Sequence, residues 1–309
     1  MKLFVTGVAG QLGHDVMNEL NKRGYEGVGS DLAPEYSGIQ DGTAVTTMPY
    51  VSVDITNASA VEKAITEAGV DGVVHCAAWT AVDAAEDEDK QEIVRKVNVL
   101  GTENIAKVCK KLGIKMMYLS TDYVFDGQGT TPWEPDCKAY KPLNVYGQTK
   151  LDGELAVYNN VDKFFIIRIA WVFGKNGKNF IKTMLRIGKE RGAASVVDDQ
   201  IGSPTYTYDL ARLLVDMIQT DKYGRYHATN EGLCSWYEFA CEIFRAAGMD
   251  VKVTPVHSDE YPAAKAKRPM NSRMSKEKLT QQGFERLPSW QDALGRYLKE
   301  LEKQEAQGK

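Results

Sequence analysis

The opening of the chain places three glycines, Gly7, Gly10 and Gly13, between a short apolar run and a stretch with helical periodicity. A glycine-rich turn between a first strand and a first helix is typical of α/β folds that bind a dinucleotide. Without Cβ atoms the backbone can approach a pyrophosphate, and the helix start offers free N–H groups and a partial positive charge. The spacing is Gly-x-x-Gly-x-x-Gly, so the loop alone is also compatible with a plain strand-to-helix turn.

The rest of the chain alternates short apolar runs with helical periodicity, which predicts an α/β fold with a doubly wound parallel (Rossmann) sheet. The run 71–77 is apolar almost throughout, as expected of a parallel strand buried on both faces. The predicted strands are 2–5, 25–30, 71–77, 114–120, 164–172 and 194–198. The predicted helices are 11–23, 58–68, 84–112, 144–159 and 177–191, and the polar segment 33–49 is expected to be a surface loop.

The sequence pattern changes in the second half, where apolar runs become fewer and a turn-rich segment, 198–204, appears. We expect residues 1–175 to form a cofactor-binding domain. Residues 176–309 are expected to form a smaller C-terminal α/β substrate-binding lobe, which could also draw in segments of the first half. Apolar residues at helical spacing between Trp290 and Gln304 predict an amphipathic closing helix.

The composition is that of an ordinary globular protein, with 309 residues, 43% hydrophobic residues and a formal net charge of -4. There is no basic excess for a nucleic-acid backbone, and no apolar run approaches the length of a bilayer span. The opening apolar run is too short for the core of a signal peptide. Five cysteines without a Cys-x-x-Cys spacing indicate reduced thiols and no metal cluster. We therefore expect a cytoplasmic protein that binds neither nucleic acid nor membrane.

Tyr146 and Lys150 lie four residues apart near the start of a predicted helix, so their side chains project from one face. Lowering a phenol pKa from about 10 to near 7 takes roughly 4 kcal/mol, at 1.36 kcal/mol per unit. An adjacent ammonium in a site that excludes water could supply much of this. Alone, the pair is an ordinary surface spacing. Together with the glycine loop, it indicates nicotinamide-dependent hydride transfer to or from a carbonyl.

Hydroxyl side chains follow the predicted strand 114–120, at the carboxyl end where ligands bind in such sheets. Either Ser120 or Thr121 could hydrogen-bond a substrate carbonyl oxygen and orient the tyrosine. The residue types alone do not choose between these two hydroxyls, and both are also ordinary strand-ending residues.

Acidic residues follow the second predicted strand and the short strand that comes after it in the chain. Asp31 stands where a carboxylate accepts hydrogen bonds from an adenosine ribose, and its charge favours NADH over a 2′-phosphorylated cofactor. Asp54 and Ile55 could border the adenine. The simpler alternatives are a turn aspartate at position 31 and a helix cap at position 54.

These motifs together resemble the extended short-chain dehydrogenase/reductases, and the likeness runs nearly end to end. The most specific segments are Ser-Thr-Asp-Tyr-Val-Phe-Asp-Gly at 120–127 and Ala-Ala-Trp-Thr-Ala-Val-Asp at 77–83. The resemblance implies a Rossmann fold and NADPH or NADH as cofactor. It further implies reduction of the C4 ketone of dTDP-4-dehydro-β-L-rhamnose (dTDP-4-keto-6-deoxy-L-mannose) to dTDP-L-rhamnose. That reaction is the last step of dTDP-rhamnose synthesis for cell-surface polysaccharide.

The resemblance also implies a role for individual residues. Thr121, Tyr146 and Lys150 would be catalytic, which favours Thr121 over Ser120, and Asn98 would lie near the packing of the third strand and a helix. The implied cofactor-binding residues are Gly7, Gly10, Gln11, Leu12, Gly13, Asp31, Asp54, Ile55, Ala77, Ala78, Tyr146 and Lys150. The implied substrate-binding residues are Thr80, Val82, Thr121, Asp122, Tyr123, Trp171, Asn179 and Arg268, the last of which would pair with the diphosphate.

Tyr123 separates the expected reduction from a related reaction. A sugar-nucleotide 4,6-dehydratase is expected to carry Thr-Asp-Glu at positions 121–123, because elimination across C5 and C6 needs an additional acid and base. Tyrosine is a poor replacement for that carboxylate. Two alternatives stay open: a 4-epimerase or other NAD(P)-dependent sugar-nucleotide reductase, and a non-catalytic regulatory subunit similar to that of methionine adenosyltransferase.

The assembly of the chain is left open by the resemblance, which is compatible with a monomer or a homodimer. Some relatives pair through an acidic, metal-assisted surface. The sequence has Tyr208 and Asp209 in the relevant region but does not indicate a ligand set, so Mg²⁺ is allowed without being indicated and no metal-binding residue is predicted.

Overall fold

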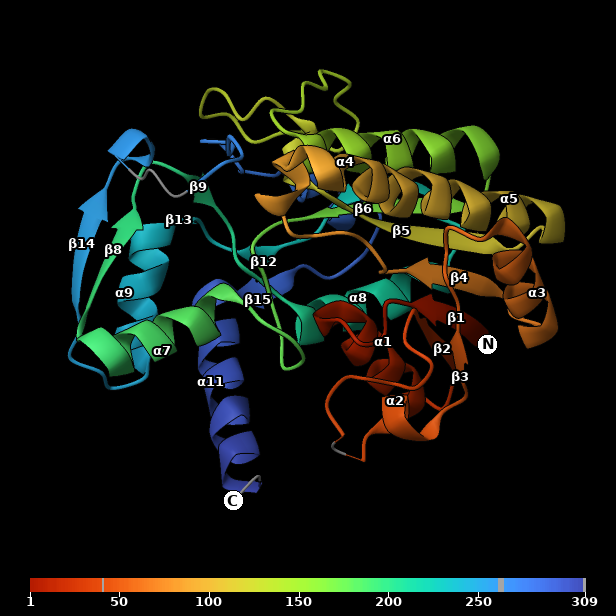
Figure 1. The fold of residues 1–309 in the computed structure, drawn as a ribbon, viewed down its shortest axis with the longest axis horizontal. Helices are drawn as coiled ribbons and strands as arrows, with labels where there is room; N and C mark the ends of the chain where they lie inside the picture. Colours follow the sequence, from red (N-terminus) through yellow and green to blue (C-terminus); the bar gives the residue numbers. More distant parts are fainter. Residues whose placement is uncertain (41, 261–263, 308–309) are drawn as a thin grey trace.

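The computed structural model describes residues 1–40, 42–260 and 264–307, and a seven-stranded parallel sheet forms its centre (Figure 1). The strand order is β11-β6-β5-β4-β1-β2-β3, and every neighbouring pair is parallel. The strands are β1 (Lys2–Thr6), β2 (Glu26–Asp31), β3 (Tyr50–Ser52), β4 (Gly72–His75), β5 (Lys115–Thr121), β6 (Phe164–Ile169) and β11 (Gly224–His227). The predicted doubly wound sheet is confirmed, and its order reverses between β1 and β4.

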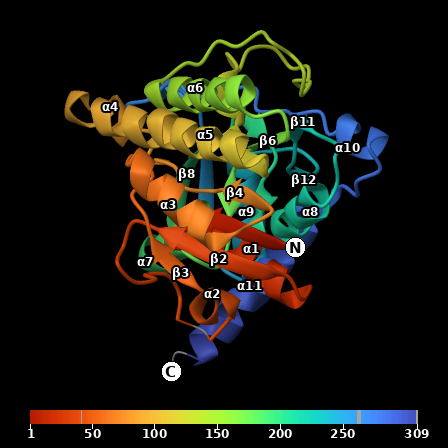
Figure 2. The ribbon, with the colours of Figure 1, turned by 90° about the vertical axis from the view of Figure 1, so that its right-hand side faces the viewer.

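Helices cover both faces of this sheet (Figure 2). The alternation of side chains along β1 shows why, because Leu3 and Val5 enter the core on one face and Phe4 enters the core on the other. One face is covered by α1 (Gln11–Lys22) and α8 (Thr207–Ile218), and the other by α3 (Ala58–Ala68), α5 (Thr102–Leu112) and α6 (Val145–Asn160). The short helix α2 (Ala44–Thr47) lies within the segment expected to be a loop.

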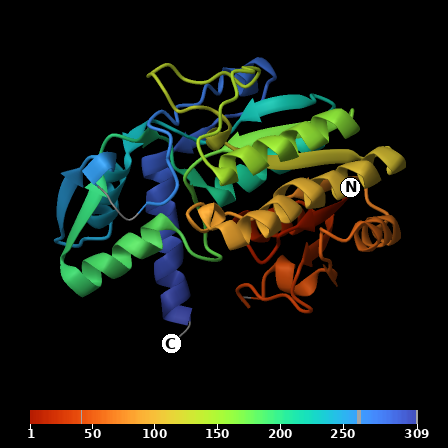
Figure 3. The ribbon, with the colours of Figure 1, turned by 45° about the horizontal axis from the view of Figure 1, so that its top comes forward.

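A smaller lobe with its own aromatic core stands beside the sheet (Figure 1). It contains α7 (Phe180–Arg191), β8 (Ala193–Val197), α9 (Trp236–Ala246), β14 (Lys252–Val256) and α11 (Trp290–Gln307). The predicted closing helix is confirmed as α11, in which Leu294, Tyr297 and Leu298 are buried. Figure 3 shows the C-terminal end of α11 pointing away from the sheet.

The predicted domain boundary after residue 175 does not separate the sheet from the lobe, because the chain later returns to the sheet. Both α8 and β11 belong to residues 176–309, yet α8 packs against α1 and β11 forms one edge of the main sheet. The division into a cofactor-binding part, 1–175, and a substrate-binding part, 176–309, therefore stays a prediction about which part binds which ligand. The remaining short elements are η3 (Asp122–Val124), β7 (Val172–Phe173), β9 (Ile201–Gly202), β10 (Thr205–Tyr206), β12 (Asn230–Glu231), β13 (Cys234–Ser235), η4 (Ser258–Glu260), α10 (Glu277–Gln281) and β15 (Leu287–Ser289).

Two of the predicted strands were wrong in part. The run 164–172 ends at Ile169 and resumes as β7, because Trp171 between them has a left-handed backbone with φ of 51°. The run 194–198 does form a strand, but β8 pairs with β14 in a separate two-stranded sheet. The strand at the far edge of the main sheet, β11, was not predicted.

The predicted helix 84–112 is interrupted. Its described segments are η1 (Ala84–Glu86), α4 (Glu88–Arg95), the π-helical segment η2 (Lys96–Gly101) and α5. Asp87 adopts an extended conformation and separates the first two. The π-helical turn carries Asn98 inward, where its side chain is 1% exposed. The hydrophobic periodicity continues through all these segments, so the sequence pattern does not indicate where the helix is interrupted.

Candidate active site

The predicted site residues come together at the carboxyl ends of β1, β4 and β5. The glycine loop follows β1, Ala77 and Ala78 follow β4, and Thr121 ends β5. Tyr146 and Lys150 lie on the first turns of α6, whose N-cap Asn144 accepts a hydrogen bond from the Gly147 N–H at 2.7 Å. The strand order reverses between β1 and β4, and open α/β sheets bind their ligands at the carboxyl ends of the strands beside such a point.

The glycine loop is packed too closely for side chains at two of its three glycines. Gly7 has φ of +72°, and a Cβ there would lie 2.6 Å from the backbone nitrogen of Ala77. A Cβ on Gly13 would overlap the carbonyl oxygen of Gly7. Gly10 is the N-cap of α1 and has no side chain to accept from the first turn. The loop therefore fits a phosphate cradle made of backbone groups, as a dinucleotide requires.

The other two loop residues contact protein. Leu12 is buried in the core below the loop, so only its backbone can face a ligand. The side chain of Gln11 accepts a hydrogen bond from Asn179 Nδ2 at 3.1 Å. Asn179 caps α7 and also donates to the Tyr297 hydroxyl at 2.8 Å. The structure thus uses Asn179 to join the two lobes, and its expected contact with substrate stays a prediction.

The acidic residues after β2 and β3 are both held by backbone groups. Asp31 accepts from the Ala9 N–H at 3.0 Å and from the Leu32 N–H at 2.8 Å, which ties the end of β2 to the glycine loop. Asp54 accepts from the Thr56 N–H at 2.9 Å. The residue that caps α3 is Asn57. The helix-cap alternative for Asp54 is therefore wrong, and its predicted adenosine contact stays a prediction.

Ile55, the residue after Asp54, is buried. It packs closely against Gly101, where an added Cβ would lie 2.7 Å from the Ile55 side chain. This packing alone explains why an apolar residue stands at position 55. The predicted contact of Ile55 with the cofactor therefore stays a prediction.

The two hydroxyls at the end of β5 face different partners. Ser120 Oγ donates to Glu154 Oε1 at 2.6 Å, within the buried interior. Thr121 Oγ1 donates to Asp122 Oδ1 at 2.9 Å, and the Thr121 hydroxyl lies near enough to Tyr146 to act to lower the pKa of that phenol. Of these two hydroxyls, only that of Thr121 acts on the tyrosine, which is the distinction that the residue types alone left open.

Tyr146 and Lys150 have shifted pKa values with different causes. Burial and the nearby Asp122 charge raise the pKa of Tyr146 above its usual range, so the phenol is protonated at neutral pH. Burial lowers the pKa of Lys150 to about 7, and Glu154 opposes that shift. Lys150 Nζ donates to the Leu119 carbonyl at 2.7 Å. Burial, Asp122 and Thr121 are the influences on the Tyr146 pKa, so the expected lowering by the Lys150 ammonium is not seen in this structure.

The segment after β5 supplies further polar contacts. Asp122 is buried, which raises its pKa to about 6, and it accepts from Ser272. The ring of Tyr123 lies edge-on to that of Tyr146, with centroids 5.6 Å apart. Arg268 Nη2 donates to Asp83 Oδ2 at 2.7 Å, so the guanidinium predicted to bind a diphosphate is held by a carboxylate.

The remaining predicted substrate contacts lie on two surfaces. Thr80 is exposed and Val82 is partly exposed, on the loop that follows β4. Asn98 holds that loop by accepting from the Trp79 N–H at 2.8 Å. Trp171 stacks on Trp236 with centroids 3.8 Å apart. These positions are compatible with a ligand between the sheet edge and the lobe, and the contacts stay predictions.

Sequence reasoning missed several residues of this region. Glu154 follows Lys150 by four residues, so helical spacing could have found it. Asp83 ends the segment 77–83 of the resemblance but was given no role, and Trp236 and Ser272 reach the site from distant parts of the chain.

The part of the chain that the structure describes offers no candidate metal centre. It contains no group of three or more His, Cys, Asp or Glu side chains arranged to hold an ion. The buried carboxylate of Asp209 accepts from Arg296 at 2.6 and 2.8 Å and from Asn230 at 2.9 Å. In the same described residues, no helix is long and apolar enough to cross a membrane.

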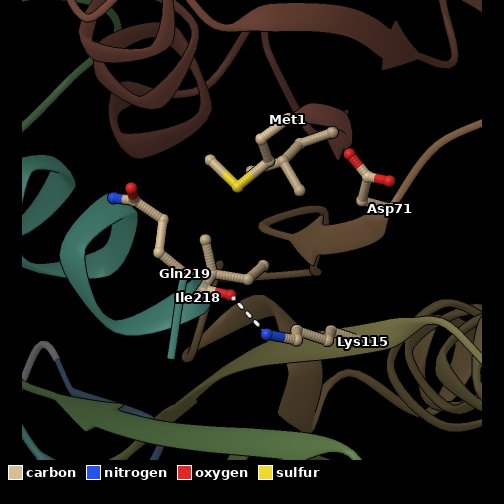
Figure 4. A pocket seen from close by; sticks show the side chains of 6 residues that line it. Met1, Asp71, Lys115, Ile218 and Gln219 are labelled. Carbon is tan, nitrogen blue, oxygen red and sulfur yellow. Dashed lines mark hydrogen bonds between the residues drawn. The ribbon is translucent and has the colours of Figure 1, made fainter. Parts of the chain in front are cut away.

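A surface hollow at the opposite edge of the sheet does not compete with this site. It is lined by Met1, Asp71, Lys115, Ile218 and Gln219 (Figure 4). Lys115 Nζ crosses it and donates to the Ile218 carbonyl at 3.3 Å. It carries none of the predicted residues.

Comparison with known proteins gives the family. The model of the RmlD substrate binding domain matches residues 1–303. The chain belongs to that family. Among curated relatives, dTDP-4-dehydrorhamnose reductase from Escherichia coli (strain K12) is 40% identical over 260 residues, which is 80% of this chain and 85% of that protein.

Solved structures of the family share the whole fold. A dTDP-4-dehydrorhamnose reductase from Clostridium acetobutylicum aligns with a TM-score of 0.88 at 38% identity, covering 98% of this chain and all of that chain, 100%. The enzyme of the same name from Bacillus anthracis, solved in complex with NADP, aligns with a TM-score of 0.87 at 39% identity, covering 97% and 99%. The family assignment predicted from the sequence is confirmed.

Proposed function

We propose that the chain is an NAD(P)H-dependent reductase that converts dTDP-4-dehydro-β-L-rhamnose to dTDP-L-rhamnose, the last step of dTDP-rhamnose synthesis. The observation that carries the proposal is the placement of the Thr121 hydroxyl, at the carboxyl end of β5, close enough to Tyr146 on the first turn of α6 to shift its pKa, with Lys150 one turn further along that helix. The relatives named dTDP-4-dehydrorhamnose reductase support it. We propose a cytoplasmic location, in keeping with five free cysteines, and either a monomer or a homodimer.

The mechanism follows from the protonation states of the site residues. A bound nicotinamide supplies the hydride for the C4 carbon. Tyr146, protonated because its pKa is raised, donates its proton to the developing alkoxide oxygen. Thr121, whose single hydroxyl proton goes to Asp122 in the structure, would turn that proton to the same oxygen when the substrate binds. Because both donors are held in place before charge develops, they stabilise mainly the transition state.

Lys150 acts on the cofactor side of the same helix. Its Nζ, already a donor to the Leu119 carbonyl, would donate to a ribose hydroxyl, and its charge would stabilise the tyrosinate left after proton transfer.

The closest competing reactions differ in their need for further groups. Burial raises the pKa of Tyr123 above its usual range, so it offers neither a carboxylate nor a phenolate for a 4,6-dehydratase. A 4-epimerase would return the hydride to the sugar and retain its cofactor. A regulatory subunit would consume no cofactor.

A single spectrophotometric assay tests the proposal. With the substrate generated in situ, we expect loss of both NADH and NADPH absorbance and formation of dTDP-L-rhamnose. Asp31 favours NADH, whereas the Bacillus anthracis relative binds NADP, so both cofactors are expected to work. Stoichiometric bound cofactor without net oxidation would instead indicate an epimerase, and tight binding to another protein without turnover would indicate a regulatory subunit.

Paired substitutions at the end of β5 test the proposed donor. Thr121→Val is expected to lower kcat by about 10²- to 10³-fold, because one donor to the alkoxide is lost. Ser120→Ala removes a hydroxyl that faces Glu154 and is expected to lower kcat much less. Steady-state kinetics of the two variants at saturating NADPH give the comparison. A larger loss of kcat in Ser120→Ala than in Thr121→Val would show that Ser120, and not Thr121, is the donor.

A further inference from the structure

A buried ion pair lies directly behind the catalytic residues. Glu154 and Arg168 have side chains 1% and 0% exposed. Arg168 Nη2 donates to Glu154 Oε2 at 2.7 Å, and Nε donates to Oε1 at 2.8 Å. Arg168 on β6 is in register with Ser120 on β5, and both contact the same carboxylate from α6. Desolvating such a pair is costly, so its presence calls for a reason beyond stability.

The rest of the guanidinium is satisfied by the protein. Nη1 donates to the Pro135 carbonyl at 3.0 Å, and Nη2 donates to the Tyr140 hydroxyl at 3.2 Å. The guanidinium lies 5.0 Å from the ring centroid of Phe125. His227 Nε2 lies 3.3 Å from Nη1, and burial keeps the pKa of that imidazole well below its usual value. The whole arrangement fixes the position of the Glu154 carboxylate.

Glu154 stands on the catalytic face of α6. Tyr146, Lys150 and Glu154 are spaced by four residues, so they follow one another along one side of the helix. Burial lowers the pKa of Lys150 to about 7, and the Glu154 charge is the largest influence that opposes it.

The other groups that face Lys150 are neutral or distant. The ring of Tyr118 on β5 lies 4.1 Å from Nζ. At the end of β4, burial lowers the pKa of His75 to about 3 and raises that of the adjacent Cys76 thiol to about 12, so neither carries charge at neutral pH. Asp122 acts on Tyr146. Glu154 is therefore the negatively charged group that raises the pKa of Lys150.

We propose that Glu154 is a positioning residue that keeps Lys150 charged during turnover and turns the Ser120 hydroxyl away from the reacting oxygen, while Arg168 holds its carboxylate in place. The inference rests on the proposed reductase activity, because it assigns Lys150 a charged role there. The sign follows from the charge. Without the carboxylate, the Lys150 pKa falls, and the rate is lost at a lower pH as the ammonium deprotonates.

Glu154→Gln tests the charge while nearly keeping the shape. We expect the alkaline limb of the kcat profile to move to lower pH by about one unit, which is a fall of up to tenfold in kcat above that limb. Glu154→Asp keeps the charge and is expected to restore much of the wild-type profile. Asp152→Asn on the same helix, whose carboxylate pairs with Gln148 at the partly exposed face, is the matched control and should leave the profile unchanged.

A second variant keeps the test decisive if Glu154→Gln does not fold. Glu154→Leu combined with Arg168→Met removes both charges and replaces them with apolar side chains of similar size. A smaller shift in the same direction is expected, because the Arg168 charge that opposes the carboxylate is removed with it. A folded double variant with the wild-type limb, or a Glu154→Asp limb displaced as far as that of Glu154→Gln, would overturn the proposal.

A binding measurement separates this inference from the proposed function. The pH dependence of NADH affinity, followed by its fluorescence on binding, should show the same displaced limb in Glu154→Gln without any substrate. If the wild-type protein has no reductase activity, the proposed function fails. If the protein is active but the NADH-binding limb is unmoved, the role of Glu154 fails alone.

Discussion

Replacing Tyr146 by Phe is expected to lower kcat by about 10²- to 10⁴-fold while leaving the affinity for NADPH within a few-fold of wild type. The phenol is the proton donor to the alkoxide, and its raised pKa keeps it protonated at working pH. Phenylalanine retains the edge-on contact with Tyr123, so the geometry of the site should survive. The loss should therefore fall on the chemical step.

Single-turnover kinetics at saturating NADPH and fluorescence titration of the cofactor separate these two quantities. Tyr158→Phe is the matched control, because Tyr158 lies on the same helix with its side chain about half exposed. It is expected to turn over at the wild-type rate. A near-normal kcat in Tyr146→Phe would show that Tyr146 is not the proton donor. Thr121 would then be the remaining candidate for that role.

The parts of the fold that the sequence predicted are those with local signals. Glycine spacing and apolar runs located the glycine loop and the inner strands, because each depends on neighbouring residues. The edge strand β11, with the sequence Gly-Arg-Tyr-His, has no apolar run, and only its pairing with β6 makes it a strand. Similarly, the interruption at Asp87 leaves the helical periodicity on either side intact.

The site shows the same division between local and long-range information. The spacing of Tyr146 and Lys150 was readable from the helix period. The difference between Ser120 and Thr121 depends on a carboxylate 34 positions away from Ser120, which no local pattern reveals. Asn179 was expected at the substrate, whereas its amide is shared among Gln11, Gly174 and Tyr297 from three separate segments. Long-range packing decides these contacts.

Arg168→Met is expected to produce the largest loss of stability. Removing the guanidinium leaves Glu154 buried without its ion-pair partner, and breaking such a pair typically costs about 3–5 kcal/mol. Denaturant unfolding followed by circular dichroism measures the change. Arg186→Met is the matched control, because its ion pair with Glu190 is exposed on α7 and should contribute no more than about 0.5 kcal/mol.

Two further measurements identify the unpaired carboxylate as the cause of that loss. The double variant Glu154→Leu with Arg168→Met should recover most of the stability, since no buried charge is left uncompensated. In Arg168→Met alone, the Glu154 pKa would rise above its value in the unfolded chain. The penalty should then be largest above the raised pKa and should shrink as the pH falls through it and the carboxyl takes up a proton. A loss that matches the Arg186→Met control, or one that is independent of pH, would show that the buried pair contributes little. The catalytic face of α6 would then be held by apolar packing.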